Sequence, residues 1–399
     1  MNDCCASASS QSKVAVSSME SADAAIRPFR IQVLETDLDD LRDRLVRTRW
    51  PDEPADVGWD YGVPLGYLKE LVDYWQSSYD WRKHETRLNE FAQFTTTIDG
   101  QNLHFLHVRS PERDALPVVI TYGWPSSIVD FMKIIGPLIN PRAQGGDPAD
   151  AFHVVVPSIP GFGFSGPTQD SGWNLDRHTA AMAELMRRLG YQRYGAHGGD
   201  FGSLISPALG RLDCDRVVGV HVVGLLTQPP RDPDELRSLN DFERNRVEKV
   251  TRWMRKGRGY ALIQATQPQT LAYGLSDSPV GLLAWLTAPF TEYSDPNIPL
   301  DRDQLLSNVM LYWLTGTVGS SSRLFKETGR DLASAREPST VPTGMAVFPF
   351  DPLLPIRSVV ERTQNIVHWS EFDRGGHFPA MEVPDLLVDD LRQFFRRLR

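Results

Sequence analysis

The most informative segment of the sequence is His197-Gly198-Gly199-Asp200-Phe201-Gly202. It follows a short apolar and aromatic run at residues 191–196 and precedes residues 203–209, which can begin a helix. A reactive residue with small residues two positions before and after it, between a strand and a helix, is typical of a nucleophile elbow. This turn is so tight that only small residues fit at Gly198 and Gly202. The segment therefore predicts that Asp200 is a nucleophile held at the end of a strand.

An aspartate in this position favours a particular chemistry. The carboxyl group of an unperturbed aspartate has a pKa of about 3.9, so it is ionised at neutral pH and needs no base to activate it. Its attack on carbon produces an alkyl ester of the enzyme, which must then be hydrolysed. Asp200 therefore suits epoxides and alkyl halides better than esters or amides. The alternative is that Asp200 only caps the helix that follows it.

Composition excludes several classes of function. The chain has 399 residues, 41% hydrophobic and 23% charged, which is enough for a large core and more than one domain. The net charge of −9, with both signs mixed along the chain, argues against a nucleic-acid partner. The cysteines Cys4, Cys5 and Cys214 form no disulfide framework, which favours a reducing cytoplasm. No apolar run approaches the roughly 20 residues of a membrane span, and we expect neither a signal peptide nor a membrane anchor.

Hydrophobic periodicity divides the chain into five expected segments. A flexible tail is followed by a helical N-terminal unit, an α/β core in two parts and a helical lid inserted between those parts. Helices are expected at 36–45, 65–75, 176–189, 241–254, 260–265, 281–285, 305–315 and 383–398. Strands are expected at 94–98, 103–108, 118–121, 152–156, 191–196, 217–223, 345–348 and 366–369. The predicted segments are the tail at 1–26, the N-terminal unit at 27–93, the core at 94–225 and 341–399, and the lid at 226–340.

Two further residues complete a catalytic set with Asp200. Hydrolysis of an ester needs a base to activate water, and the base needs an orienting carboxylate. In α/β-hydrolases these groups follow the nucleophile in the order acid, then histidine, and each comes after a strand. Asp351 follows the strand predicted at 345–348, and His377 follows the one at 366–369. The alternative is that Asp351 only occupies a turn and that His377 is an ordinary surface histidine.

Stabilisation of the tetrahedral anion needs backbone N–H donors. In this fold they come from the loop after the third strand and from the residue after the nucleophile, which are Trp124 and Phe201 here. The alternative for the loop Tyr122-Gly123-Trp124-Pro125 is a plain turn.

These motifs together resemble the microsomal-type epoxide hydrolases, which are α/β-hydrolases with an extra N-terminal domain. The resemblance covers residues 27–395 and includes Arg49-Trp50-Pro51, Gly123-Trp124-Pro125, His197-Gly198-Gly199-Asp200, Asp277-Ser278-Pro279-Val280-Gly281, Asn308 to Trp313, Val341-Pro342-Thr343-Gly344, Phe348-Pro349-Phe350-Asp351 and Gly375-Gly376-His377-Phe378. It implies an α/β-hydrolase fold, Asp200 as nucleophile, His377 as base and Asp351 as its orienting acid. It also implies a hydrophobic small-molecule epoxide and water as reactants, no cofactor and no metal, and it leaves room for a homodimer.

In this family, tyrosine hydroxyls from the lid open the epoxide. Tyr260 matches the first tyrosine, whereas Phe325 occupies the place of the second and cannot donate a proton. Either Tyr260 acts alone or another hydroxyl substitutes, with Tyr293 and Tyr312 as lid candidates. Tyr122 is a second departure, because the family usually has histidine before Gly-Trp-Pro. Tyr122, Tyr312 and Phe325 are therefore the candidates for lining the substrate pocket, and Tyr312 is also a candidate for the core.

Three functions compete. The first is an epoxide hydrolase that acts in detoxification or natural-product biosynthesis. The lid aromatics Trp285, Phe290 and Trp313 suggest a bulky hydrophobic epoxide as its substrate, with aryl epoxides as one option. The second is a haloalkane dehalogenase, which needs an N–H donor for the halide beside the nucleophile, where Phe201 has none. The third is a catalytically impaired ligand-binding homologue, suggested by Phe325.

Overall fold

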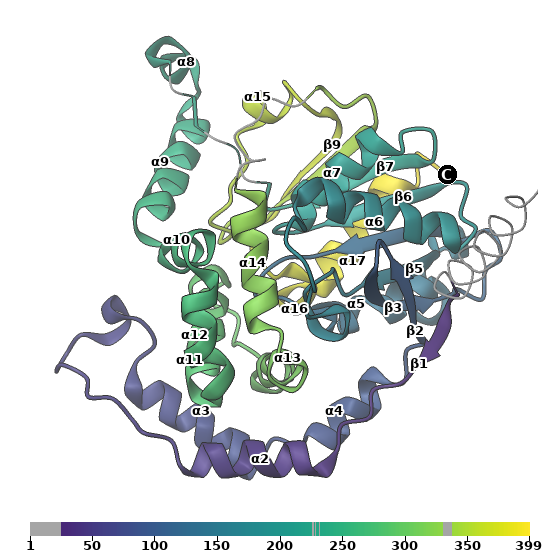
Figure 1. The fold of residues 1–399 in the computed structure, drawn as a ribbon. Helices are drawn as coiled ribbons and strands as arrows, with labels where there is room; N and C mark the ends of the chain where they lie inside the picture. The colour runs from purple at the N-terminus through teal and green to yellow at the C-terminus, as the bar shows by residue number, and fades with distance from the viewer. Residues whose placement is uncertain (1–24, 226, 228, 231, 330–336) are drawn as a thin grey trace, which may run out of the picture.

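The computed structural model describes residues 25–225, 227, 229–230, 232–329 and 337–399. The predicted tail lies outside the described residues except for its last two positions. Within the described part, nine strands form one sheet in the order β1-β2-β3-β5-β4-β6-β7-β8-β9 (Figure 1). The strands are β1 (Arg27–Phe29), β2 (Gln93–Ile98), β3 (Gln101–Val108), β4 (Leu116–Thr121), β5 (Phe152–Pro157), β6 (Tyr194–Gly198), β7 (Val217–Val223), β8 (Pro342–Val347) and β9 (Asn365–Glu371).

The sheet is antiparallel at one end and parallel through the rest. The pairs β1–β2, β2–β3 and β3–β5 are antiparallel, and all pairs from β5–β4 to β8–β9 are parallel. The central strands are nearly continuous apolar runs, such as Val154 to Val156, which are completely buried. Such runs are typical of parallel strands covered on both faces. This is the mainly parallel α/β sheet that the sequence predicts.

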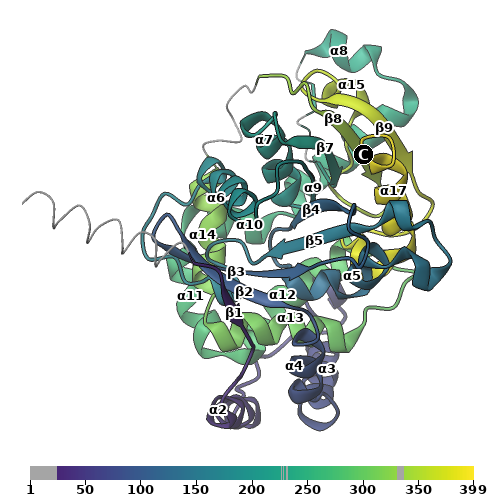
Figure 2. The ribbon, with the colours of Figure 1, turned by 90° about the vertical axis from the view of Figure 1, so that its right-hand side faces the viewer.

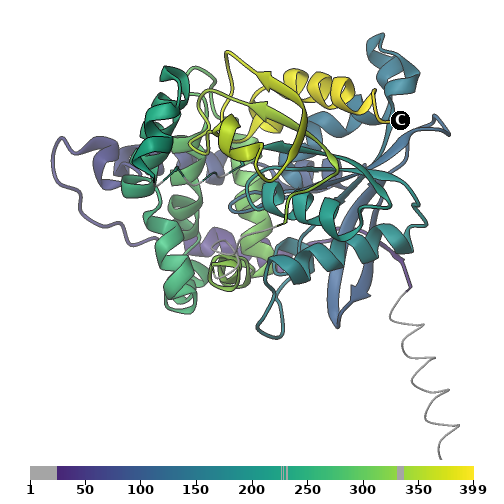
Figure 3. The same cartoon turned by 90° about the horizontal axis from the view of Figure 1, so that it is seen from above.

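Helices cover both faces of the sheet. Figure 2 shows α6 and α7 on one side and α5 and α17 on the other. The same separation appears from above in Figure 3, where the yellow C-terminal helix lies opposite the teal helices. The core helices are α5 (Met132–Ile139), α6 (Leu175–Arg188), α7 (Gly202–Leu212), α15 (Arg357–Val360), α16 (Pro379–Glu382) and α17 (Pro384–Phe395). Short 3-10 turns are η1 (Gly58–Tyr61), η2 (Ile128–Phe131), η3 (Pro141–Gln144), η4 (Pro148–Asp150) and η5 (Gly163–Ser165).

The described residues between β7 and β8 are mainly helical. The helices are α8 (Pro233–Ser238), α9 (Asp241–Lys256), α10 (Gly259–Thr266), α11 (Pro268–Asp277), α12 (Pro279–Tyr293), α13 (Arg302–Thr315) and α14 (Val318–Thr328). The sequence did not predict α14, because three consecutive serines hide its apolar face. These serines are buried, and the Ser322 hydroxyl donates to the Val318 carbonyl at 2.7 Å.

The N-terminal helices run beneath the helices that follow β7 (Figure 1). They are α2 (Glu35–Val46), α3 (Leu65–Ser77) and α4 (Trp81–Leu88). Arg44 donates to the Asp277 carboxylate at 2.9 Å, and the Tyr74 hydroxyl donates to Asp303 at 2.7 Å. The N-terminal segment therefore braces the lid through contacts on α11 and α13. The limits assigned above to the N-terminal unit and the lid stay predictions.

Candidate active site

Asp200 occupies the tight turn between β6 and α7. Its φ is 52°, in the left-handed region that side chains rarely adopt. A Cβ atom at Gly198 would lie 2.1 Å from the Gly202 carbonyl oxygen, and one at Gly202 would lie 2.3 Å from the Thr121 carbonyl oxygen. Both positions therefore require glycine. The capping alternative for Asp200 is wrong, because Phe201 is the cap residue of α7 and no side chain caps that helix.

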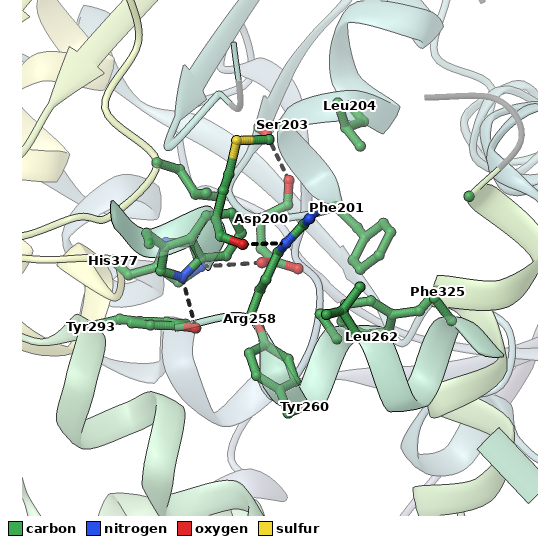
Figure 4. A pocket seen from close by; sticks show the side chains of 16 residues that line it. Asp200, Phe201, Ser203, Leu204, Arg258, Tyr260, Leu262, Tyr293, Phe325 and His377 are labelled. Atoms are coloured by element: carbon green, nitrogen blue, oxygen red, sulfur yellow. Dashed lines mark hydrogen bonds and ion pairs between the residues drawn. The ribbon is translucent and has the colours of Figure 1, made fainter. Parts of the chain in front are cut away.

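Asp200, His377 and Asp351 form one hydrogen-bonded chain. His377 Nε2 lies 3.2 Å from Asp200 Oδ2 (Figure 4). On the other side of the ring, His377 Nδ1 lies 3.0 Å from Asp351 Oδ1. Asp351 and His377 are buried, with 3% and 7% of their surface exposed. Asp351 Oδ1 also accepts from the Leu353 N–H at 2.8 Å, which fixes the carboxylate. The three residues come from the ends of β6, β8 and β9, at one edge of the parallel sheet.

The two carboxylates control the protonation of His377. Burial alone would lower the pKa of the imidazole, but the charge of Asp351 and the hydrogen bonds to Asp200 and Asp351 outweigh burial and raise it to about 10. His377 is therefore protonated at neutral pH. Loss of the negative charge on Asp200 would therefore lower the pKa of His377.

The loop after β4 contacts the nucleophile directly. The Trp124 N–H donates to Asp200 Oδ1 at 3.0 Å, so it lies where the predicted oxyanion donor is needed. The Trp124 ring is buried and stacks on Tyr260 at a centroid distance of 4.9 Å. The Phe201 N–H stays a predicted donor.

An apolar chamber of about 200 Å³ opens above Asp200 and His377. Figure 4 shows that helices following β7 supply much of its wall, including Tyr260, Leu262 and Phe325. Other lining residues are Phe201, Leu204, Trp253, Met254, Arg258, Tyr293 and Leu353. The Phe325 ring contacts both Phe201, at 4.8 Å, and Tyr260, at 5.8 Å between centroids. Phe325 therefore closes the chamber where the family places a second tyrosine.

The two tyrosines of the chamber, Tyr260 and Tyr293, have different surroundings. The Tyr293 hydroxyl donates to the Gly257 carbonyl at 2.8 Å and accepts from the Trp253 indole at 2.9 Å. Its proton is therefore engaged within the protein. Burial, the neighbouring Tyr293 and the Asp200 carboxylate raise the pKa of Tyr260 well above its usual value. Tyr260 consequently keeps the proton that it would donate.

Several predicted pocket residues lie elsewhere. The prediction that Tyr312 lines the pocket is wrong, because it is 2% exposed and its hydroxyl donates to the Ser126 carbonyl at 2.8 Å. Tyr122 lies outside the substrate chamber, in a smaller cavity behind Asp200. The lid aromatics are also absent from the chamber wall: Trp285 donates to Gln264, and Phe290 packs on Phe378. Trp313 lies under Arg44.

Some residues that line the two cavities were not predicted from the sequence. Trp253 and Met254 line the chamber from the end of α9, and Arg258 lines it from the start of α10. Their only sequence signal was their proximity to Tyr260. Asp130 was also missed, although it follows Trp124-Pro125 closely and lines the small cavity. In the part of the chain that the structure describes, no cluster of three or more histidine, cysteine or carboxylate residues could hold a metal. No described helix combines the length and apolarity needed to cross a bilayer.

Comparison with known proteins agrees with this geometry. Residues 26–131 match the family model for the epoxide hydrolase N terminus, and residues 117–262 match the α/β-hydrolase fold model. A relative from Stigmatella aurantiaca (strain DW4/3-1) is 42% identical over 94% of this chain and 86% of its own length. Epoxide hydrolase 1 of Sus scrofa is 34% identical over 93% of this chain and 89% of its own length.

A solved structure extends the comparison to the fold. The epoxide hydrolase of Aspergillus niger superimposes with a TM-score of 0.86 at 32% identity, over 94% of this chain and 97% of that one. The match includes both the N-terminal segment and the catalytic sheet. The chain therefore belongs to the microsomal-type epoxide hydrolases, α/β-hydrolases that carry an epoxide hydrolase N-terminal domain.

Proposed function

We propose that the chain hydrolyses hydrophobic epoxides to vicinal diols through an ester of Asp200. The observation that carries this proposal is the hydrogen-bonded chain Asp200–His377–Asp351 at the floor of an apolar chamber, with Tyr260 in the chamber wall. Asp200 Oδ2 attacks an epoxide carbon while the carbon–oxygen bond of the ring breaks. Tyr260 donates its proton to the departing oxygen. The Trp124 N–H holds Oδ1, which becomes the ester carbonyl oxygen.

Ester formation then prepares His377 for the second step. An ester at Asp200 carries no charge, so one of the two groups that raise the pKa of His377 is lost. The imidazole can release its proton and accept one from water, while Asp351 holds its orientation. Water attacks the ester carbonyl carbon, and the N–H groups of Trp124 and Phe201 stabilise the resulting anion. The diol leaves with the original Asp200 Oδ2, and solvent exchange returns a proton to Tyr260.

The chamber wall indicates the class of substrate. Leu204, Met254, Leu262 and Phe325 offer apolar surface, which favours a hydrophobic or aryl substituent on the epoxide. Styrene oxide is a suitable first substrate on these grounds. A role in detoxification or natural-product biosynthesis and a cytoplasmic location stay predictions.

The two other functions receive less support. A departing halide would need N–H donors in the chamber, and the ring of Phe201 offers none where it contacts Phe325. A binding protein would not require the intact trio of Asp200, His377 and Asp351. Chloride release from a haloalkane, or binding of epoxides without turnover, would favour these alternatives.

An isotope experiment tests the ester pathway. A single turnover of styrene oxide by excess enzyme in 18O-labelled water should give unlabelled diol, because the new oxygen comes from Asp200. The label should instead appear in the peptide that contains Asp200. Labelled diol in that first turnover would show direct attack by water and contradict the proposal.

A further inference from the structure

Two cavities meet at the catalytic pair. The apolar chamber lies on one side, and a second cavity of about 30 Å³ lies behind the nucleophile. Asp200 and His377 are the residues that line both of these cavities. The small cavity is also lined by Tyr122, Ser126, Asp130, His197 and Gly199, and by the apolar side chains of Phe131, Val223 and Leu387. Its volume is sufficient for one or two water molecules, each of which needs roughly 10–15 Å³.

Asp130 is the unexplained polar group of the small cavity. It lies in η2 and is 4% exposed, and its Oδ1 accepts no hydrogen bond from the residues that the structure describes. Burial raises the pKa of Asp130 to about 7, although hydrogen bonds from the Ser126 hydroxyl and the Ser127 N–H oppose this change. A buried carboxylate oxygen without a protein donor is costly unless water hydrogen bonds to it. The free Oδ1 therefore makes the cavity a favourable site for water.

We propose that the small cavity holds the water that hydrolyses the Asp200 ester, and that Asp130 is the residue that positions it. This inference rests on the proposed function. One O–H of the water donates to His377 Nε2 and the other donates to Asp130 Oδ1, which directs a lone pair at the ester carbonyl carbon. The water oxygen bonds to that carbon, and His377 takes one of its two protons. The bond from the carbon to the diol oxygen then breaks, the diol oxygen takes the second proton of the former water, and Asp200 returns to a carboxylate beside the protonated His377. Asp130 neither donates nor accepts a proton in this step.

The geometry separates the two reactants. The epoxide reaches Asp200 from the apolar chamber, whereas the water reaches the ester from the opposite side. An alkyl group bound in the chamber therefore does not displace the water. Removal of the Asp130 carboxylate should consequently slow hydrolysis of the ester and leave its formation unchanged.

The test compares the two steps in Asp130→Asn, which nearly keeps the size of the side chain. Stopped samples from a single turnover of styrene oxide are analysed by intact mass spectrometry, so that ester formation and ester loss are timed separately. We expect formation within about twofold of wild type and hydrolysis slower by about tenfold, the effect of one lost charge-assisted hydrogen bond. The ester on Asp200 should therefore accumulate in the variant.

Two further variants make the result specific. Asp150→Asn is the control, because it removes another buried carboxylate that pairs with Arg396 and lines neither cavity. It should change neither ester formation nor ester hydrolysis. Gly199→Ala adds a methyl group at the cavity wall, where a Cβ atom would meet nothing within 4 Å. It should also slow hydrolysis selectively, because the methyl group takes space from water. It provides the same test if Asp130→Asn does not fold.

The outcomes are distinguishable. Unchanged hydrolysis in folded Asp130→Asn would overturn the inference and leave the ester pathway standing. Equal slowing of both steps would show a structural role for Asp130 and would also overturn it. Absence of any ester on Asp200 in wild type and in His377→Gln would overturn the proposed function, and this inference with it.

Discussion

Tyr260→Phe should abolish most of the ring-opening activity. The variant removes one hydroxyl and keeps the ring that stacks on Trp124 at 4.9 Å, so the chamber wall stays in place. No other phenol in the chamber is free to compensate. Phe325 has no hydroxyl, and the Tyr293 proton is engaged by the Gly257 carbonyl at 2.8 Å. The loss should therefore approach the full contribution of a general acid.

The expected loss of rate is large because the chamber offers no second free phenol. General acid catalysis contributes roughly 10²–10⁴ in rate, and the absence of a second donor places the expected loss near 10³, or about 4 kcal/mol. The assay is ester formation on Asp200 in a single turnover of styrene oxide, measured by rapid quench and intact mass spectrometry. Tyr273→Phe is the matched control, because Tyr273 lies on α11, is 72% exposed and is absent from the chamber wall.

A double variant tests whether a phenol at position 325 can replace the hydroxyl of Tyr260. Adding Phe325→Tyr to Tyr260→Phe should restore part of the rate, since the two rings are in contact at 5.8 Å between centroids. A loss of less than about tenfold in Tyr260→Phe would refute the claim that Tyr260 is the principal proton donor. Such a result would point to Tyr293 or to a water molecule.

Three other changes have defined outcomes. Phe325→Tyr alone should accelerate ester formation several-fold by supplying a second donor, and an unchanged single-turnover rate would count against this idea. Asp351→Asn should slow ester hydrolysis by about 100-fold or more and let the ester accumulate, because His377 loses both its orienting partner and a stabilising charge; equal slowing of ester formation would argue against that division of roles. The pKa of His377 is raised on folding from about 6.5 to about 10. Its stabilising contribution is therefore complete below pH 6.5 and is lost as the pH rises to 10. The Tm of wild type should fall more steeply than that of His377→Gln between pH 7 and 10 in scanning calorimetry, and parallel curves would contradict the assignment.

The meeting of Asp200, Asp351 and His377 at one edge of the sheet was predictable because each residue has a local signal in the sequence. A tight turn demands small residues around the nucleophile, and these residues are adjacent in the sequence at Gly198 and Gly202. Asp351 and His377 each follow an apolar strand, and the ends of parallel strands meet at one edge of a sheet. The sheet itself was predictable for the same reason, since its buried strands are short apolar runs with clear limits. The order of the strands in the sheet was not predicted from the sequence and is known from the structure.

The chamber wall was much less predictable. Helices α12 and α13 are buried on nearly all sides, because they pack against both the core and their neighbours. The sequence pattern therefore does not show which aromatic side chain faces the substrate. Tyr312 and Phe290 are buried in that packing, whereas the less conspicuous Met254 and Leu262 line the chamber. Asp130 was missed because a single carboxylate near a turn has no distinctive spacing.

The central claim is that Asp200 forms a covalent ester that His377 is needed to hydrolyse. The most direct measurement is intact mass spectrometry of His377→Gln after mixing with styrene oxide, followed by peptide mapping. We expect a mass increase of one substrate molecule, located on the peptide that contains Asp200. This adduct should persist for a time in which wild type completes many turnovers. A folded variant that shows no adduct with styrene oxide or with larger hydrophobic epoxides, while wild type produces diol, would contradict it.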